Sequence, residues 1–141
     1  MFRGRFSHSI DDKGRTIIPV KFRLLLGERF VITKGLDKCL WVFTEEGFGR
    51  LDERLTAQPM LDPNAVCLQR FFSAEAVDAT TDSQGRVALP SNLREYAAID
   101  KEVVSVGAGN RIEIWSKSRW DEISSSMDDA QIRAAATEVG I

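Results

Sequence analysis

The chain has 141 residues, a formal net charge of −2 at pH 7, 43% hydrophobic residues and 28% charged residues. This composition is typical of a soluble globular protein, and no stretch of 18 apolar residues is present that could span a membrane. The first residues also lack the apolar core of a signal peptide. We therefore expect a cytoplasmic protein with one ordinary domain or two very small ones.

The charge is distributed unevenly along the chain. Residues 1–70 hold 12 Lys and Arg against 9 Asp and Glu, whereas residues 71–141 hold 7 against 12. Much of the positive excess lies in residues 1–23, which contain six basic and two acidic side chains. A local basic patch can attract phosphate groups even on an acidic protein, and a merely solvated surface is the competing interpretation.

An internal repeat with an offset of 71 residues organises the sequence. The segment DDKGRTIIP at 11–19 aligns with DSQGRVALP at 82–90, with Asp, Gly, Arg and Pro in identical register. Phe22-Arg23 aligns with Leu93-Arg94, and after one inserted residue the apolar segments align as well. We expect two units, at 1–51 and 74–123, joined by a linking helical segment at 52–73 and followed by a tail at 124–141.

The two units predict the same elements in the same order. The first has strands at 4–10 and 15–18 around a turn at 11–14, a helix from Pro19 to about Gly27, and strands at 30–34 and 40–43. The second has strands at 75–81 and 86–89, a helix from Pro90, and strands at 102–106 and 111–115. The turn glycine supplies a positive φ, and the proline suits the first helical position.

Helix signals follow each unit. Thr44 and Ser116 are predicted N-caps, and Asp62-Pro63 is predicted to start a helix at 64–72. The tail predicts a short helix at 128–136 or partial disorder. Most aromatic residues are expected in the core, as are the small side chains of Cys39 and Cys67, and Phe2 and Phe6 could instead cover a subunit interface. The packing candidates of the linking helix are Val66, Leu68, Phe71 and Phe72.

A unit of about 50 residues with four short strands is too small to bury a comfortable core alone. Two units could solve this problem by interlocking their strands, so that each completes the barrel of the other. The linking helical segment would then connect them.

The repeated turns are the strongest candidates for a binding site. Arg15 and Arg86 offer planar guanidinium groups that can bind a phosphate, or the edge of a guanine, in bidentate fashion. Gly14 and Gly85 could bare backbone N–H groups toward phosphate, and Lys13 adds a charge to the first turn only. Asp11 and Asp82 lie four residues before each arginine and could hold its guanidinium; a purely structural ion pair is the alternative interpretation.

Catalytic and metal-binding patterns are sparse. His8 is the only histidine, so multi-histidine metal sites are excluded, and no phosphate-binding or dinucleotide-binding loop motif is present. We expect no enzyme, no metal and no cofactor. The enzyme hypothesis that stays open would use His8 with Asp11 and Asp12.

The ordered set of motifs resembles the MraZ family across nearly the whole chain, up to about Ser124. The set comprises the opening MFRG, the turn DDKGR followed by Pro19, the stretch RFFSA at 70–74, and the turn DSQGR followed by Pro90. The resemblance implies an α+β fold of two tandem SpoVT–AbrB units, with swapped-hairpin β-barrels and short helices. It also implies ring-shaped homo-oligomers, octameric or larger.

The resemblance further implies a function. It implies a cytoplasmic, nucleoid-associated regulator of transcription. We therefore expect a repressor of the division and cell wall gene cluster that also acts on its own promoter. The partner would be double-stranded DNA with short direct repeats, contacted by Arg15 and Arg86 of the two Asp-x-x-x-Arg motifs. A protein-interaction module resembling antitoxins is the competing hypothesis; the short tail after Ser124, poor in aromatic residues, argues against it.

Overall fold

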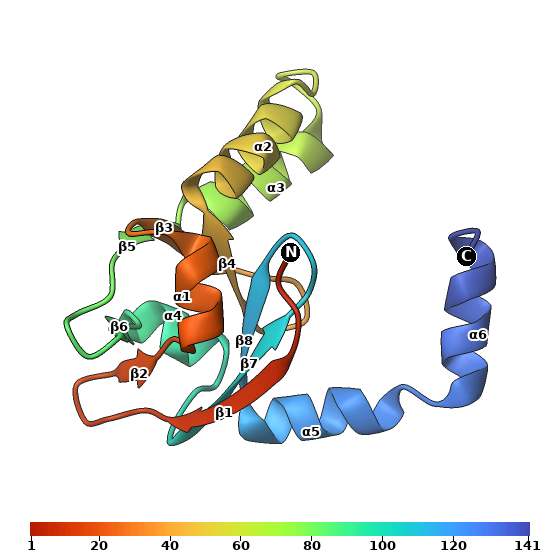
Figure 1. Ribbon diagram of the computed structural model, residues 1–141. Helices are drawn as coiled ribbons and strands as arrows, with labels where there is room; N and C mark the ends of the chain where they lie inside the picture. The colour runs from red at the N-terminus through yellow and green to blue at the C-terminus, as the bar shows by residue number, and fades with distance from the viewer.

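The computed structural model describes residues 1–141 and has the expected mixed α+β architecture with antiparallel sheets (Figure 1). The first half contains β1 (Arg5–Ser9), β2 (Arg15–Ile17), α1 (Val20–Leu26), β3 (Phe30–Lys34), β4 (Leu40–Thr44), α2 (Glu45–Thr56) and α3 (Pro63–Ser73). The second half contains β5 (Val77–Ala79), β6 (Arg86–Ala88), α4 (Ser91–Tyr96), β7 (Glu102–Gly107), β8 (Ile112–Ser116), α5 (Lys117–Ser126) and α6 (Asp129–Glu138).

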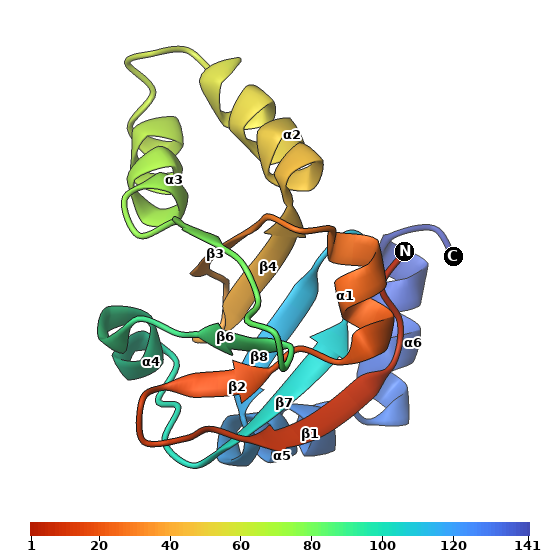
Figure 2. The same ribbon diagram turned by 60° about the vertical axis from the view of Figure 1, so that its left-hand side comes forward.

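The two halves of the chain exchange strands. The larger sheet has the order β1-β7-β8-β4-β3-β5, so β1 of the first half pairs with β7 and β5 of the second half pairs with β3. A separate ribbon, β2–β6, takes one strand from each half (Figure 2). Every strand that flanks a repeated turn is therefore paired with a strand of the other half.

A single hydrophobic core explains this exchange. Its sixteen buried residues come from both halves, and the fully buried side chains include Phe22, Phe30, Ile112 and Ile114. Neither half alone is large enough to form such a core, because a shorter chain buries a smaller fraction of its surface on folding. Burial of these side chains is the main favourable contribution to folding.

Phe2 belongs to this core, which corrects one expectation. Its side chain is buried and packs edge-on against Phe22, with ring centroids 5.8 Å apart, and the backbone of Phe2 bridges to Gly109. Phe6 makes a similar contact with Phe22 at 5.2 Å. The expectation of a subunit interface is therefore wrong for Phe2, which is buried within its own chain, whereas Phe6 is only partly buried and its role at an interface stays a prediction.

The helix starts follow local sequence signals. Thr44, Asp62 and Ser116 each accept a backbone N–H at the start of α2, α3 and α5, as predicted. Gly27 ends α1 with a φ of 80°, also as predicted. Pro19 and Pro90 lie one residue earlier than expected, at the N-cap rather than inside the first turn. Their ψ angles of 141° and 148° are extended, so the helices begin at the next residue.

Helices α2 and α3 form a pair that stands on one end of the sheet (Figures 1 and 2). The Thr33 hydroxyl on β3 donates to the backbone carbonyl of Phe72 at 2.6 Å and fastens α3 to the sheet. Phe72 is buried as predicted, whereas Leu68 is 41% exposed and Val66 and Phe71 are only partly buried. Periodicity alone could not show that the contact face of α3 is narrow.

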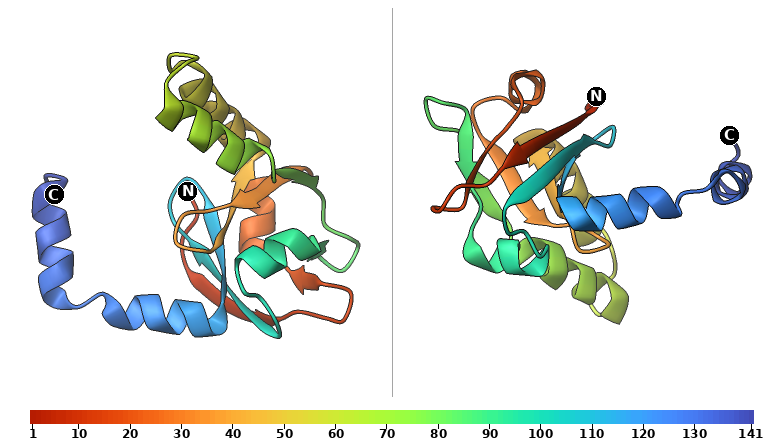
Figure 3. Two further views of the ribbon diagram at one scale, coloured as in Figure 1. Left: turned by 180° about the vertical axis from the view of Figure 1, so that it is seen from behind. Right: turned by 90° about the horizontal axis from the view of Figure 1, so that it is seen from below.

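The chain ends in two helices that differ in their packing. Helix α5 lies against β7 and β8, where Trp120 contacts Trp115 with ring centroids 5.9 Å apart. Helix α6 projects away from the body of the molecule and buries none of its residues (Figure 3). None of the helices is both long and apolar enough to cross a membrane.

Candidate nucleic-acid interface

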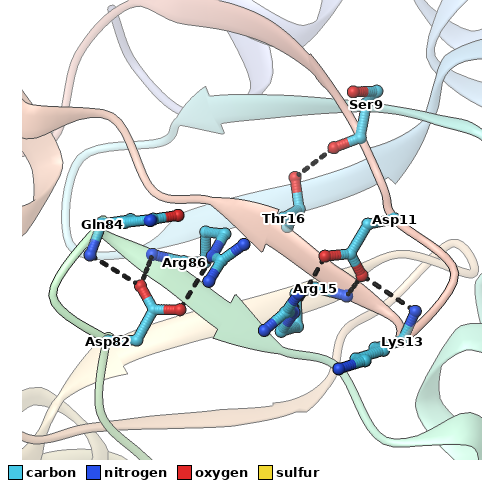
Figure 4. A network of polar contacts seen from close by, with 8 residues as sticks. All are labelled: Ser9, Asp11, Lys13, Arg15, Thr16, Asp82, Gln84 and Arg86. Atoms are coloured by element: carbon cyan, nitrogen blue, oxygen red, sulfur yellow. Dashed lines mark hydrogen bonds and ion pairs between the residues drawn. The ribbon is translucent and has the colours of Figure 1, made fainter.

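The turn between β1 and β2 is built around the carboxylate of Asp11. Its Oδ1 accepts the backbone N–H groups of Lys13 at 3.0 Å and Arg15 at 2.9 Å, and its Oδ2 accepts the Arg15 side-chain Nε–H at 2.8 Å (Figure 4). Two backbone hydrogen bonds close the loop: the Asp11 N–H donates to the Arg15 carbonyl, and the Gly14 N–H donates to the Asp11 carbonyl. One carboxylate therefore fixes both the backbone of the turn and the orientation of the arginine.

The turn between β5 and β6 repeats this geometry. Asp82 Oδ1 accepts the N–H groups of Gln84 and Arg86, both at 2.9 Å, and Oδ2 accepts Arg86 Nε–H at 2.8 Å (Figure 4). The repeat in the sequence is thus a repeat in hydrogen bonding, down to the individual carboxylate oxygens. The predicted pairing of Asp11 with Arg15 and of Asp82 with Arg86 is present.

These hydrogen bonds stabilise the charged form of both carboxylates. The pKa of Asp11 lies below its usual value of 3.8, chiefly because the Arg15 backbone N–H donates to it, with the Arg15 guanidinium adding to the effect. The pKa of Asp82 is lowered in the same way by Arg86. Both carboxylates are therefore ionised at neutral pH and hold their arginines in place.

The β2–β6 ribbon brings the two arginines to one face. Arg15 is opposite Ala88 and Arg86 is opposite Ile17, while the central pair of Thr16 and Val87 is buried. Since side chains alternate between the faces of a strand, both arginines point outward on the same side. They are diagonal neighbours across the ribbon, a relationship that separates residues by about 7–8 Å.

Each guanidinium keeps its outer edge free. Only the Nε of Arg15 and of Arg86 is bound to the turn carboxylate, and no hydrogen bond or ion pair in the structure uses their Nη atoms. The two side chains are 30% and 28% exposed. The unused Nη–H groups form a pair of donors that can bind a phosphate or a base edge.

The turn glycines act through their conformation. Gly14 and Gly85 have φ angles of 76° and 77°, which favour glycine. Both residues are buried, and their N–H groups donate to the carbonyls of Asp11 and Asp82 at 3.0 Å. The expectation that they bare N–H groups toward phosphate is wrong, because closing the turn uses those groups.

Two further arginines lie beside the turns, and the sequence analysis did not select them. The guanidinium of Arg94, on α4, lies against Gly14, and that of Arg23, on α1, lies against Gly85. Each comes from the half of the chain that does not supply the adjacent turn. The signal was available, because Arg23 and Arg94 align in the repeat. What the alignment could not show is that the two halves cross.

The remaining candidates lie around the turns. Lys13 is exposed at the tip of the first turn. His8 lies on β1 with its Nε2 buried and unpartnered, and the Asp11 oxygens accept hydrogen bonds from Arg15 and Lys13 rather than from His8. No cluster of three or more His, Cys, Asp or Glu side chains is positioned to hold a metal ion.

Fold and site together define a class: a tandem-repeat α+β protein whose halves exchange strands and present paired arginine turns on one face. The family described as "MraZ protein, putative antitoxin-like" matches residues 1–71 and again 72–139. The chain belongs to the MraZ family.

Several relatives share nearly the full length of the chain. A "Transcriptional regulator MraZ" of Moorella thermoacetica is 50% identical over 129 residues, which cover 92% of this chain and 90% of the relative. Proteins of the same name are 46% identical over 143 residues in Halothermothrix orenii, covering all of both chains, and 47% identical over 141 residues in Desulfitobacterium hafniense strain Y51, covering 100% and 99%.

Proposed function

We propose that this protein is a DNA-binding regulator of transcription and that the outward face of the β2–β6 ribbon is its DNA-binding surface. The observation that carries the proposal is the pair of arginines, Arg15 and Arg86, each oriented by an aspartate and each with free Nη groups on the same face. Relatives of nearly the same length bear the name of transcriptional regulators, which supports this function over catalysis.

The ribbon suits a DNA groove in shape and in chemistry. The major groove of B-DNA, about 12 Å wide, admits a two-stranded β-ribbon. A guanidinium held in advance by Asp11 or Asp82 loses little side-chain freedom on binding, so more of the contact energy appears as affinity. Lys13, Arg23 and Arg94 add positive charge near the turns and would contact phosphates. Gly14 and Gly85 would contribute by shaping the turns.

The targets follow from the resemblance to the family. We propose short direct repeats upstream of the division and cell wall gene cluster, including the promoter of the protein's own gene, with repression as the result. The protein would act in the cytoplasm, associated with the nucleoid. We expect it to need no cofactor.

Assembly would multiply a weak contact. We propose that the two units, at 1–51 and 74–123, form swapped-hairpin-type barrels and that several chains join in a ring, octameric or larger. The strand exchange between the halves is compatible with such barrels. A ring presents the same ribbon several times, and contacts spaced like the DNA repeats reinforce one another through effective concentration.

A titration of the full-length protein on the DNA upstream of its own gene tests this function. Fluorescence anisotropy on that duplex should show binding that is lost on a shuffled duplex of equal length and at equal salt, because phosphate contacts alone carry no sequence information. Changing the spacing between the repeats should weaken binding more than a single base change does. Equal affinity for all duplexes would refute sequence-specific regulation and favour the interaction module.

A further inference from the structure

Helix α6 is short, exposed and without a tertiary contact partner. It spans Asp129–Glu138 and buries no residue, although isolated helices shorter than about 12–15 residues are marginal in water. One face of the helix, continued by the C-cap residue Val139, carries an apolar stripe, the α6 stripe, made of Ile132, Ala135, Ala136 and Val139. Ile132 and Val139 are 54% and 70% exposed. A helix of this kind gains stability when its apolar stripe packs against another surface.

A groove of suitable character lies between α2, α3 and the sheet. Its volume is about 600 Å³. Such a volume is far larger than the gaps found in packed protein interiors, so side chains from outside can enter it. The large apolar side chains on the wall of this α2–α3 groove are Trp41, Phe43, Leu51, Leu55, Leu68 and Phe72.

The groove carries one cation without a carboxylate partner, and the helix is acidic. Of the three arginines on its lining, Arg111 is paired with Glu113 at 2.9 Å and Arg50 lies 3.9 Å from Glu46, which leaves Arg54 without an ion-pair partner beside Asp62. The last fourteen residues of the chain hold three acidic side chains and the terminal carboxylate, against Arg133 alone. Because opposite charges steer and orient association, the unpaired Arg54 favours an acidic helix as the occupant of the groove.

The helix is held away from its own groove. Helix α5 is fixed to the body where Arg119 Nη2 donates to the Asp37 carbonyl at 2.9 Å and Trp120 packs on Trp115. Helix α6 then extends outward from the end of α5, clear of α2 and α3 (Figures 1 and 3). From these features we infer that α6 docks its apolar stripe into the α2–α3 groove of a second copy of this chain.

This interface is head-to-tail, because it joins two different surfaces of the same chain. Each copy therefore offers one helix and one groove, and copies can be added until the last one binds the first and the assembly closes into a ring. The inference rests on the proposed homo-oligomer and names the contact that builds it. It does not depend on DNA binding.

The first test changes the α6 stripe in the full-length protein. The double variant Ile132→Glu/Val139→Glu should lose the assembly, and its mass by light scattering should fall toward the monomer mass of 15.8 kDa. Ala134→Glu adds the same side chain on the opposite face of α6 and should keep the wild-type mass. A wild-type protein that is itself monomeric would refute the oligomer; a wild-type mass in the stripe variant would refute only the docking of α6.

The second test identifies the occupant of the groove. Leu68→Asp/Arg54→Glu alters the groove at two exposed positions and should also lose the assembly. Mixing this groove variant with the stripe variant restores one intact helix–groove pair, so heterodimers should appear. If both variants stay monomeric in the mixture, α6 does not bind a second copy, and the inference is wrong.

Discussion

The guanidinium of Arg94 lies directly against Gly14, although the two residues belong to different halves of the chain. A Cβ atom placed on Gly14 would be 2.9 Å from Arg94 Cζ, closer than real Cβ contacts allow. Arg94 is held there by donating its Nε–H to the Leu89 carbonyl at 2.9 Å. The first arginine turn therefore depends on the second half of the chain for its support.

Gly14→Ala should destabilise the protein more than Gly109→Ala. Both glycines have a positive φ, 76° and 79°, but only Gly14 has a neighbour within 4 Å of the added Cβ. The positive φ alone costs about 1 kcal/mol, and displacing Arg94 should bring the total for Gly14→Ala to roughly 2–3 kcal/mol. Urea unfolding of the two variants measures the difference, and equal losses would show that Arg94 moves aside without cost.

Stability should fall at acid pH through the two turn carboxylates. The pKa values of Asp11 and Asp82 are lowered in the folded protein, while in the unfolded chain they return toward 3.8. The folded state therefore binds these protons less readily, so the stabilising contribution is present above pH 3.8 and is lost as pH falls through the lowered values.

The double variant Asp11→Asn/Asp82→Asn tests whether these two carboxylates cause the loss of stability at acid pH. Its unfolding free energy should depend less on pH below 3.8 than that of the wild type, because the two titrating groups are gone. Asp12→Asn, which removes an exposed carboxylate of the same turn that has no hydrogen-bond or ion-pair partner, is the matched control. The same acid loss in the wild type and the double variant would mean that other groups cause it.

The two cysteines should differ sharply in reactivity. Burial raises the pKa of the Cys39 thiol to about 12, with the nearby Glu113 carboxylate adding to the effect, and the side chain is fully buried. Cys67, on α3, is exposed, against the expectation that both cysteines pack inside. Because the thiolate is the reactive form, iodoacetamide at pH 8 should add one label per folded chain. Mass spectrometry should locate it on Cys67, and two labels added at similar rates would contradict the structure.

Local signals in the sequence identified most of the elements. The strands around the turns, the caps at Thr44, Asp62 and Ser116, and the end of α1 at Gly27 were predicted because each rests on a few neighbouring residues. The pairing partners of the strands were not predicted. Nothing in β1 itself indicates that Val103–Val106 of β7, about a hundred residues away, lies beside it.

The candidate site was predictable in composition and less so in geometry. The repeat identified Asp11, Arg15, Asp82 and Arg86, but pattern alone allowed the glycines to bare their N–H groups. Hydrogen bonds within the turn use those groups instead. The positions of Arg23 and Arg94 depend on the crossing of the two halves, which is a tertiary property. Whether these side chains contact DNA stays a prediction.

The most direct test of the central claim compares DNA affinity in Arg15→Ala, Arg86→Ala and the double variant, with assembly size checked by light scattering. A lost bidentate contact costs about 1–3 kcal/mol, so each single variant should bind roughly 5–150-fold more weakly and the double variant more weakly still. Arg70→Ala, an exposed arginine on α3, serves as the control and should bind as the wild type does. Unchanged affinity in the double variant with intact assembly would contradict the account and leave the Asp–Arg pairs a purely structural role.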